Sequence, residues 1–360
     1  MKSEELPSGW HFSLFTFSSP RGGLEGALNY IKKMVVNSPK AWFLAARPKT
    51  LAGAAAPVFI GGALAVHNLR RVIEADATVA KPAIHGGYVW VFVLCLLFAF
   101  IMQIDANFVN DYFDFKKGTD REDRLGPERA CAQGWVTPEA MKRALWITTI
   151  VGCAVGLPLV WIGGPWMILV GVLCVAAVML YTTRLSYIGL GDVLVVVFFG
   201  IVPVLFTSWC MMAQACGMDF FLSQGAWGKK EMLGGWGEAI LLGLAMGLVT
   251  DCLLMVNNYR DVEQDKISGK RTVVVLFGNS FGRRAYLWLG IIGALIATAT
   301  MMILCKDIIV TILLLYFVLH VKTYRKMCRM EGKALNKVLG ETARNIFIFG
   351  LLCSVFLYFT

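Results

Sequence analysis

The chain alternates between long apolar segments and short polar ones. Because a helix needs about 20 predominantly apolar residues to cross a bilayer, we searched for segments near that length. Nine lie at residues 42–67, 88–113, 145–164, 165–183, 187–213, 238–259, 285–305, 307–324 and 343–360. Few charged residues interrupt them, and the eighth segment is short. The pattern predicts an all-α integral membrane protein with nine transmembrane helices.

Composition supports this prediction. The chain is 57% hydrophobic and has a mean hydropathy of +0.64, whereas a soluble chain is about 45–50% apolar. Its ten cysteines are scattered, mostly inside the apolar segments, and form no Cys-x-x-Cys pair. Its four histidines have no metal-ligand spacing. These features argue against a disulfide framework, a structural zinc site and histidine-based metal chemistry.

Residues 1–39 precede the apolar region and form a leader. Glu4 and Glu5 stand where a signal peptide has its positive region, so we expect no signal peptide here. The pattern of residues 24–36 fits an amphipathic helix on the membrane surface and a solvated leader equally well. Residues 40–360 are expected to form the transmembrane domain.

The distribution of basic residues predicts the orientation. The net charge is +10. With the N-terminus inside, 28 Lys and Arg residues fall on the inner side and 6 on the outer side. The positive-inside rule then places the N-terminus in the cytoplasm and the C-terminus outside, in a plasma (inner) membrane. Alternatively, the basic loops only anchor the topology. This interpretation explains the loop at 322–344, but it does not explain why acidic residues stand among the basic ones in the other inner loops.

Two polar stretches at the ends of apolar segments resemble each other. The first is VNDYFDFKKGTDRED, from Val109 to Asp123, and the second is VNNYRDVEQDKISGKR, from Val256 to Arg271. Both contain Asn-x-Tyr-x-Asp, and both follow an even-numbered segment, which puts both on the cytoplasmic side. The likeness indicates an internal repeat, and membrane proteins often arrange repeats around a central site.

Helical spacing predicts which side chains of the first stretch lie together. Since successive residues of a helix turn by about 100°, Asn110, Asp111 and Asp114 share one face. Asp105 lies nearly opposite them.

The second stretch behaves in the same way if its helix continues. Asp261 and Asp265 are four residues apart and share a face with Asn258 and, a few turns deeper, Asp251. Glu263 points away from this face, so we do not expect it to be a ligand.

Four converging carboxylates would repel one another unless a cation lies between them. Carboxylate and amide oxygens suit Mg²⁺, which usually takes one or two carboxylates together with substrate phosphates. Basic residues stand beside the acids, and Arg binds phosphate with two hydrogen bonds. The sequence therefore predicts a Mg²⁺–diphosphate site whose basic residues are Arg124, Arg129, Lys270 and Arg271. The alternative is a solvated loop with incidental ion pairs, but two matching clusters make that less favourable.

These stretches and three others resemble the UbiA superfamily of intramembrane aromatic prenyltransferases, and within it the branch that acts on 1,4-dihydroxy-2-naphthoate. The resemblance rests on ARPKTL at 46–51, NDYFDFKKGTDREDRLGPER at 110–129, YTTRLSYIGLGD at 181–192, FFGIVPV at 198–204 and NNYRDVEQDKISGKRT at 257–272. It covers about residues 40–360. Three positions depart from the family pattern: Gly118 and Gln264 replace an Asp and a Gly, and Asp192 stands where Glu is expected.

The resemblance implies nine transmembrane helices around a central cavity, with cytoplasmic cap loops. It also implies Mg²⁺-dependent transfer of a polyprenyl chain from its diphosphate to an aromatic acid, in contact with membrane lipid and without nucleic acid. Oligomeric state and prenyl chain length stay open. In this scheme the Mg²⁺–diphosphate ligands are Asn110, Asp111, Asp114, Asp261 and Asp265, with Asn257 also beside the diphosphate.

The resemblance also implies a subsite for the aromatic acid, with Arg47, Tyr181 and Asp192 as candidates. Arg47 is expected to hold either the diphosphate or the naphthoate carboxylate, or else to anchor a helix start at the interface. For Tyr181 and Asp192 the alternative is helix packing and capping.

Two other functions compete with this one. A prenyltransferase of the same superfamily could act on 4-hydroxybenzoate, haem or a glycerol phosphate lipid. A cation-coupled transporter would also carry acids in a helical bundle, although its site would lie near mid-membrane. Mg²⁺-dependent release of diphosphate distinguishes a prenyltransferase from a transporter.

Overall fold

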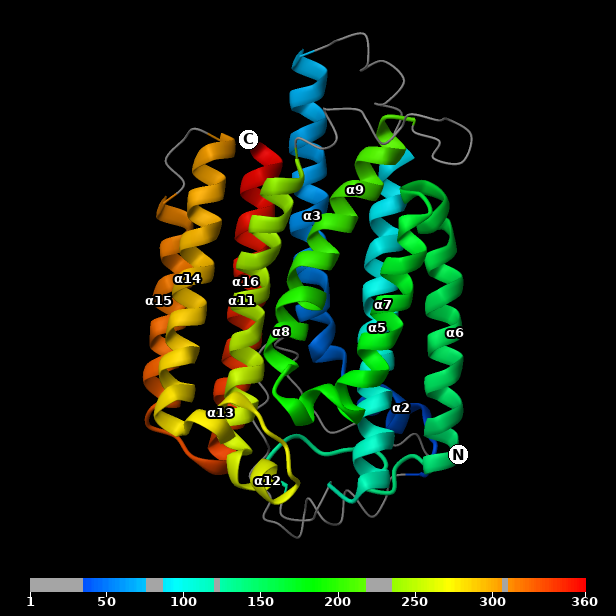
Figure 1. The fold of residues 1–360 in the computed structure, drawn as a ribbon, viewed down its shortest axis with the longest axis vertical. Coiled ribbons are helices and arrows are strands. Elements are labelled where there is room, and N and C mark those ends of the chain that lie inside the picture. Colours follow the sequence, from blue (N-terminus) through cyan, green and yellow to red (C-terminus); the bar gives the residue numbers. More distant parts are fainter. Residues whose placement is uncertain (1–34, 76–86, 120–123, 218–234, 306–309) are drawn as a thin grey trace, which may run out of the picture.

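Long helices run side by side through almost the whole of this computed structural model (Figure 1). The structure describes residues 35–75, 87–119, 124–217, 235–305 and 310–360, and every regular element in these ranges is a helix. Most of the leader, including residues 24–34 of its predicted amphipathic segment, lies outside them.

The first half of the chain begins with the short helix α2. The elements are α2 (Pro39–Ala46), α3 (Pro48–Ala75), α5 (Gly87–Lys117), α6 (Pro138–Gly163), α7 (Trp166–Thr183), the 3₁₀-helix η1 (Leu185–Ile188), α8 (Gly191–Val196), the π-helix η2 (Val197–Ile201) and α9 (Val202–Ala215). Because α8, η2 and α9 follow one another without a break, they act as one long helix with a local widening.

The second half begins with a long buried helix. Its elements are α11 (Trp236–Arg260), α12 (Val262–Ile267), α13 (Val273–Phe277), α14 (Asn279–Cys305), α15 (Val310–Met327), the 3₁₀-helix η4 (Gly332–Ala334) and α16 (Leu335–Phe359).

Eight helical stretches in the described ranges are long and apolar enough to cross a membrane. They correspond to eight of the nine predicted segments. The remaining long helix, α15, packs against α14 and α16, but its last turns carry Lys322, Arg325 and Lys326. Because of these charges α15 is less apolar than the other eight helices and is not among those apolar enough to cross a membrane. The count of nine spans therefore stays a prediction.

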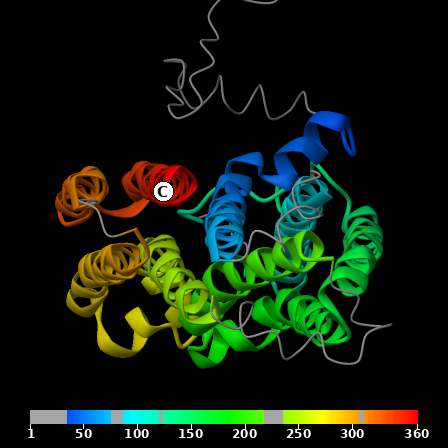
Figure 2. The same cartoon turned by 90° about the horizontal axis from the view of Figure 1, so that it is seen from above.

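The helices form a closed ring in chain order (Figure 2). Neighbours in the sequence pack against each other from α3 to α16, and α16 returns to pack against α3. The largest buried cluster joins these two helices to α9, α11 and α14. This closure places α5 and α11, which carry the two acidic motifs, in one bundle.

The outer surface carries many large apolar side chains that no other part of the described chain covers. They include Trp146, Ile150, Trp161, Val172, Leu295 and Ile303. Large apolar patches are rare on soluble monomers, whereas lipid chains cover such side chains in a membrane. The chain is accordingly a multi-pass membrane protein.

The first predicted span is wrong at its start. We expected one segment over 42–67, but the helix breaks at Arg47, between α2 and α3. The backbone of Arg47 is left-handed, with φ 51°. The reason lies in Pro48, because the ring of a proline excludes the preceding residue from the right-handed helical region.

Helix α8–η2 packs very closely on α11. A Cβ added to Gly200 would lie 2.3 Å from the carbonyl oxygen of Gly243, and one added to Gly247 would lie 2.5 Å from that of Val196. Glycine at these positions therefore lets two backbones touch, as is usual for helices packed inside membranes.

Candidate active site

The two acidic motifs lie at the same end of the bundle, drawn at the bottom of Figure 1. The first occupies the last turns of α5, and the second lies where α11 meets α12. We call this end the motif end. The C-terminus lies at the other end of the bundle (Figure 1).

Asp111 is completely buried and holds the loop that follows α5. Its Oδ2 accepts a hydrogen bond from the backbone N–H of Ala130, and its Oδ1 accepts one from that of Cys131, both at 2.9 Å. Arg47 Nη2 lies 3.9 Å from the same carboxylate. The predicted metal ligand Asp111 thus fixes the loop at 130–131 and lies within reach of Arg47.

Asp114, one turn further along, forms a close ion pair with Arg129. Arg129 Nη2 donates to its Oδ2 at 2.7 Å, and both side chains are buried. The other oxygen, Oδ1, is buried and has no hydrogen-bond partner in the described part of the chain. Asp114 therefore has one oxygen available for a further ligand.

Asn110 and Lys117 connect α5 to the end of α7. Asn110 Oδ1 accepts a hydrogen bond from the Thr182 hydroxyl. Lys117 Nζ donates to the carbonyl oxygens of Thr182 and Thr183, both at 3.0 Å. The amide oxygen of Asn110 points toward α7 in this structure.

The second motif contains a charged network that sequence reasoning missed. Helix α11 ends at Arg260, whose guanidinium donates to both oxygens of Asp261, at 2.7 and 2.6 Å. Arg260 Nη1 also donates to Asn336 Oδ1 at 2.7 Å, and Asn336 Nδ2 donates to the Leu125 carbonyl at 2.8 Å. This network ties the loop after α5 to the second motif and to α16.

Asp265 lies one turn beyond Asp261, as the predicted spacing requires. The helix changes direction at Asp261, yet the Asp265 N–H still donates to the Asp261 carbonyl at 2.8 Å. The pKa of the Asp265 carboxyl is raised to about 6, mainly by burial; Lys270 and Arg260 lower it, and the charges of Asp261 and Asp114 raise it. Lys270 Nζ lies 4.0 Å from Asp265 Oδ1.

Tyr187, on η1, lies between the two motifs. Lys117 Nζ is 4.2 Å from the centre of its ring and Lys270 Nζ is 5.7 Å from it, so one lysine from each motif faces the same ring. Burial raises the pKa of Tyr187, and the charges of Asp114 and Asp265 raise it further. The two motifs therefore converge around η1.

The donor set suits a hard cation that binds together with phosphate. No three His, Cys, Asp or Glu side chains of the described residues lie close enough to hold a metal ion by themselves. Mg²⁺ needs only one or two carboxylates when phosphate oxygens complete its shell. Asp114 can supply one such carboxylate oxygen through its available Oδ1. The charge of Asp114 also acts on Asp265, which can supply the second carboxylate.

The basic residues predicted for the diphosphate differ in exposure. Arg129 is buried against Asp114, whereas Arg271 is exposed and its backbone N–H donates to the Tyr187 carbonyl at 3.2 Å. Arg124 Nε donates to the Pro127 carbonyl at 3.2 Å. Asn257 lies one helical turn before Asp261 and accepts the Asp261 N–H with its carbonyl, at 2.9 Å.

A second layer of polar residues lies deeper in the bundle. Tyr181, at the end of α7, packs close to Gly191, and Asp192 follows in the first turn of α8. Tyr181 therefore lies beside the start of α8, which carries Asp192, while their role in an aromatic subsite stays a prediction.

The two acids predicted to lie off the site do so. Asp105 is buried on the side of α5 that faces α6, where it accepts a hydrogen bond from the Thr149 hydroxyl at 2.8 Å. Glu263 is exposed and pairs with Lys266 at 2.8 Å.

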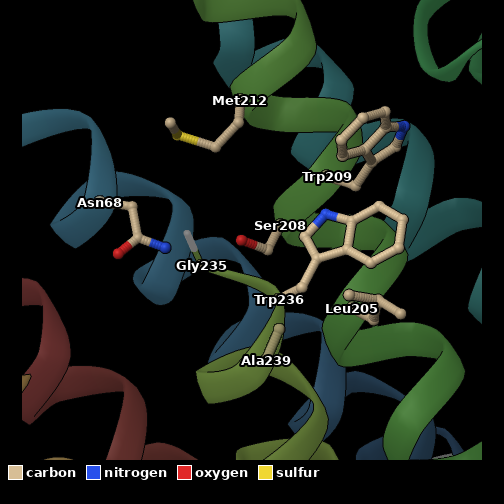
Figure 3. Close-up of a pocket in the computed structure, with 8 residues that line it drawn as sticks. All are labelled: Asn68, Leu205, Ser208, Trp209, Met212, Gly235, Trp236 and Ala239. Atoms are coloured by element: carbon tan, nitrogen blue, oxygen red, sulfur yellow. The ribbon is translucent and has the colours of Figure 1, made fainter. Parts of the chain in front are cut away.

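A small cavity lies nearer the other end of the bundle (Figure 3). It is lined by Asn68, Leu205, Ser208, Trp209, Met212, Gly235, Trp236 and Ala239. Trp209 and Trp236 meet edge to face at 5.4 Å, and Trp209 Nε1 donates to the Gly163 carbonyl at 2.8 Å. Its lining includes no acid or base, so we place the chemistry at the motif end.

Comparisons with known proteins indicate the family of the chain. A model described as the UbiA prenyltransferase family matches residues 75–356. Over 328 residues the chain is 32% identical to 1,4-dihydroxy-2-naphthoate octaprenyltransferase from Escherichia coli (strain K12), covering 88% of this chain and 94% of that protein. The protein of the same name from Haemophilus influenzae is 33% identical over 261 residues, covering 70% and 74% respectively.

Among solved structures, the fold is similar to the apo structure of a UbiA homolog from Aeropyrum pernix K1. The TM-score is 0.57 at 14% sequence identity, covering 82% of this chain and 96% of that one. At this identity the likeness concerns the fold alone.

Proposed function

The chain belongs to the UbiA prenyltransferase family, and on this basis we propose that it transfers a polyprenyl chain to 1,4-dihydroxy-2-naphthoate. The donor is a polyprenyl diphosphate, the carboxyl group leaves as CO₂, and the product is demethylmenaquinol. The observation that carries this proposal is the 32% identity to the Escherichia coli enzyme over 94% of that enzyme's length. The convergence of both acidic motifs around Tyr187 supports it.

The leaving group is the centre of the first step. The bond between the allylic carbon and the diphosphate oxygen breaks, and its electron pair leaves with diphosphate. Asp114, Asp261 and Asp265, with Asp111 and Asn110 beside them, would hold Mg²⁺. The bound ion would supply positive charge where negative charge develops.

Basic side chains at the motif end provide the rest of that charge. Lys270 and Arg271 come from the second motif, and Arg124 and Arg129 come from the loop after α5. Arg129 already carries a buried ion pair with Asp114. A diphosphate at this position therefore meets cations from both motifs at once.

The acceptor then forms the new bond. A ring carbon of the naphthoate donates its electrons to the allylic carbon. The bond to the carboxylate breaks, its electron pair restores the aromatic ring, and CO₂ leaves. The reaction consumes no net proton. The bundle excludes water, which would otherwise capture the allylic cation.

Arg47, Tyr181 and Asp192 are our candidates for the aromatic subsite. Arg47 lies at the break between α2 and α3, with its guanidinium 3.9 Å from Asp111. An Arg at this place can bind a carboxylate with two hydrogen bonds. Two anions sharing a low-dielectric cavity repel unless cations intervene, and Arg47 would supply the cation for the acid.

We further propose that the motif end faces the cytoplasm of a plasma (inner) membrane, with the C-terminus outside. The distribution of Lys and Arg supports this orientation. Residues 40–360 would form the prenyltransferase domain, and residues 1–39 a leader.

The test is to incubate membranes containing the protein with a polyprenyl diphosphate, Mg²⁺ and 1,4-dihydroxy-2-naphthoate. We expect a prenylated naphthol of the corresponding mass, with CO₂ and diphosphate released in equal amounts. A product that keeps its carboxyl group would assign another acceptor of the family, such as 4-hydroxybenzoate. The absence of diphosphate release with any acceptor would favour a cation-coupled transporter.

A further inference from the structure

Two carboxyl groups with buried oxygens lie on α8 and α11, two helices that pack against each other. Asp251, on α11, is 2% exposed, and its Oδ1 has no hydrogen-bond partner in the described part of the chain. The same holds for the buried Oδ1 of Asp192, on α8. Gly200 meets Gly243 and Val196 meets Gly247, four residues further along each helix, and the next step in this register brings Asp192 beside Asp251.

The close packing of α8–η2 on α11 holds this pair together. The backbones touch at Gly200 and Gly243 and again at Val196 and Gly247, one turn from Asp251. Two neighbouring carboxylates in a low-dielectric interior cannot both be charged without a large penalty, and a shared proton removes that penalty. The pair is therefore suited to hold one proton and exchange it.

The position of the pair fits the place of the acceptor. Asp251 precedes Asn258 of the second motif by two helical turns. It therefore lies about 10 Å deeper in the bundle than that motif. Tyr181 packs close to Gly191, the residue before Asp192. The reacting carbon is bonded directly to the diphosphate, so the acceptor ring must lie just inside the motifs.

We propose that the Asp192–Asp251 pair takes the proton of a ring hydroxyl of the aromatic acceptor and returns it after the new bond has formed. Removal of this proton gives a phenolate, whose ring carbons are more electron-rich and attack the allylic carbon more readily. When CO₂ leaves and the ring becomes aromatic again, the phenolate oxygen takes the proton back. The exchange needs no outside acid or base. This proposal rests on the proposed function.

The test compares two acceptors in two variants. Asp251→Asn and Asp192→Asn keep the shape of each side chain but cannot take a proton. With 1,4-dihydroxy-2-naphthoate, we expect kcat to fall by about 100-fold, with little change in the KM for the polyprenyl diphosphate. With a ring-halogenated acceptor, whose hydroxyl is more acidic, the loss should be several-fold smaller (on the order of 10-fold).

The matched control is Asp105→Asn. Asp105 is a fully buried acid of α5 that also has an oxygen without a hydrogen-bond partner among the described residues, but it lies away from the site. We expect this variant to keep wild-type kcat with both acceptors.

Each result decides the question. A loss that is equal for both acceptors would assign the pair a structural role and overturn the proposal, as would unchanged kcat. If one variant does not reach the membrane, the other carries the same comparison. In the wild type, single-turnover product formation must be slower in D₂O, and equal rates would also overturn it. A wild type that forms no prenylated product would instead refute the proposed function.

Discussion

Replacing Asp111 by Asn tests whether this residue holds the loop after α5. In the structure each carboxylate oxygen of Asp111 accepts one backbone N–H, from Ala130 and from Cys131, and the side chain is fully buried. An Asn side chain has one oxygen and one NH₂ group. One of the two backbone N–H groups would then face a donor instead of an acceptor.

The size of the effect follows from the loss of this hydrogen bond in a buried place. A buried donor left without an acceptor costs about 1–3 kcal/mol, and hydrogen bonds to charged groups lie in the upper part of that range. We therefore expect Asp111→Asn to lower the free energy of unfolding by about 2 kcal/mol. For a chain of 360 residues that corresponds to a fall in Tm of about 3 °C, at roughly 1–2 °C per kcal/mol.

The assay is thermal unfolding of the purified protein in detergent, followed by tryptophan fluorescence. Asp105→Asn is the control, because its amide oxygen can still accept the hydrogen bond of Thr149, and its Tm should change little. A wild-type Tm in Asp111→Asn would refute the bonding that we describe for its carboxylate. Loss of activity in this variant alone would not identify a metal ligand, since the loop itself would loosen.

The remaining predictions concern the roles of single side chains in turnover. Asp261→Asn should reduce turnover by at least about 100-fold, and excess EDTA should abolish it in the wild type; full activity in either case would exclude the Mg²⁺ site. Glu263→Ala should keep most activity, because this side chain is exposed and pairs only with Lys266 in the described structure; a loss as large as that of Asp261→Asn would place it in the site. Arg47→Ala should raise the KM for the aromatic acid about tenfold or more, and more than the KM for the diphosphate; the opposite order would assign Arg47 to the diphosphate.

Much of the site could be predicted from helical spacing alone. Asp111 and Asp114 share a face of α5 because they are three residues apart, and Asp105 faces α6 for the same reason. The repeat of Asn-x-Tyr-x-Asp predicted that the two motifs would meet, and both lie at the motif end. Periodicity determines such features because a helix fixes the angle between its residues.

Contacts between distant segments could not be predicted in this way. Asn336 lies 76 residues from Arg260 and 211 residues from Leu125, and no local pattern marks it as a partner of both. Arg260 did carry a signal, since it stands inside the second motif next to Asp261. The break at Arg47 also had a signal in Pro48, but the hydrophobic pattern continues across it and hides it.

The ion pairs at the motif end bear on how the proposed Mg²⁺–diphosphate site would be occupied. The buried Asp114 pairs with Arg129 and the partly buried Asp261 pairs with Arg260, so both acids already have cationic partners. Arg260 occupies both oxygens of Asp261, so Mg²⁺ alone would have to compete with it there, whereas Oδ1 of Asp114 is available. A diphosphate carries more negative charge than one Mg²⁺ neutralises, so it can attract the cations that the metal displaces. Exchange of partners keeps every buried charge compensated, which a low-dielectric interior requires. The arrangement therefore favours the metal and the diphosphate together over either one alone.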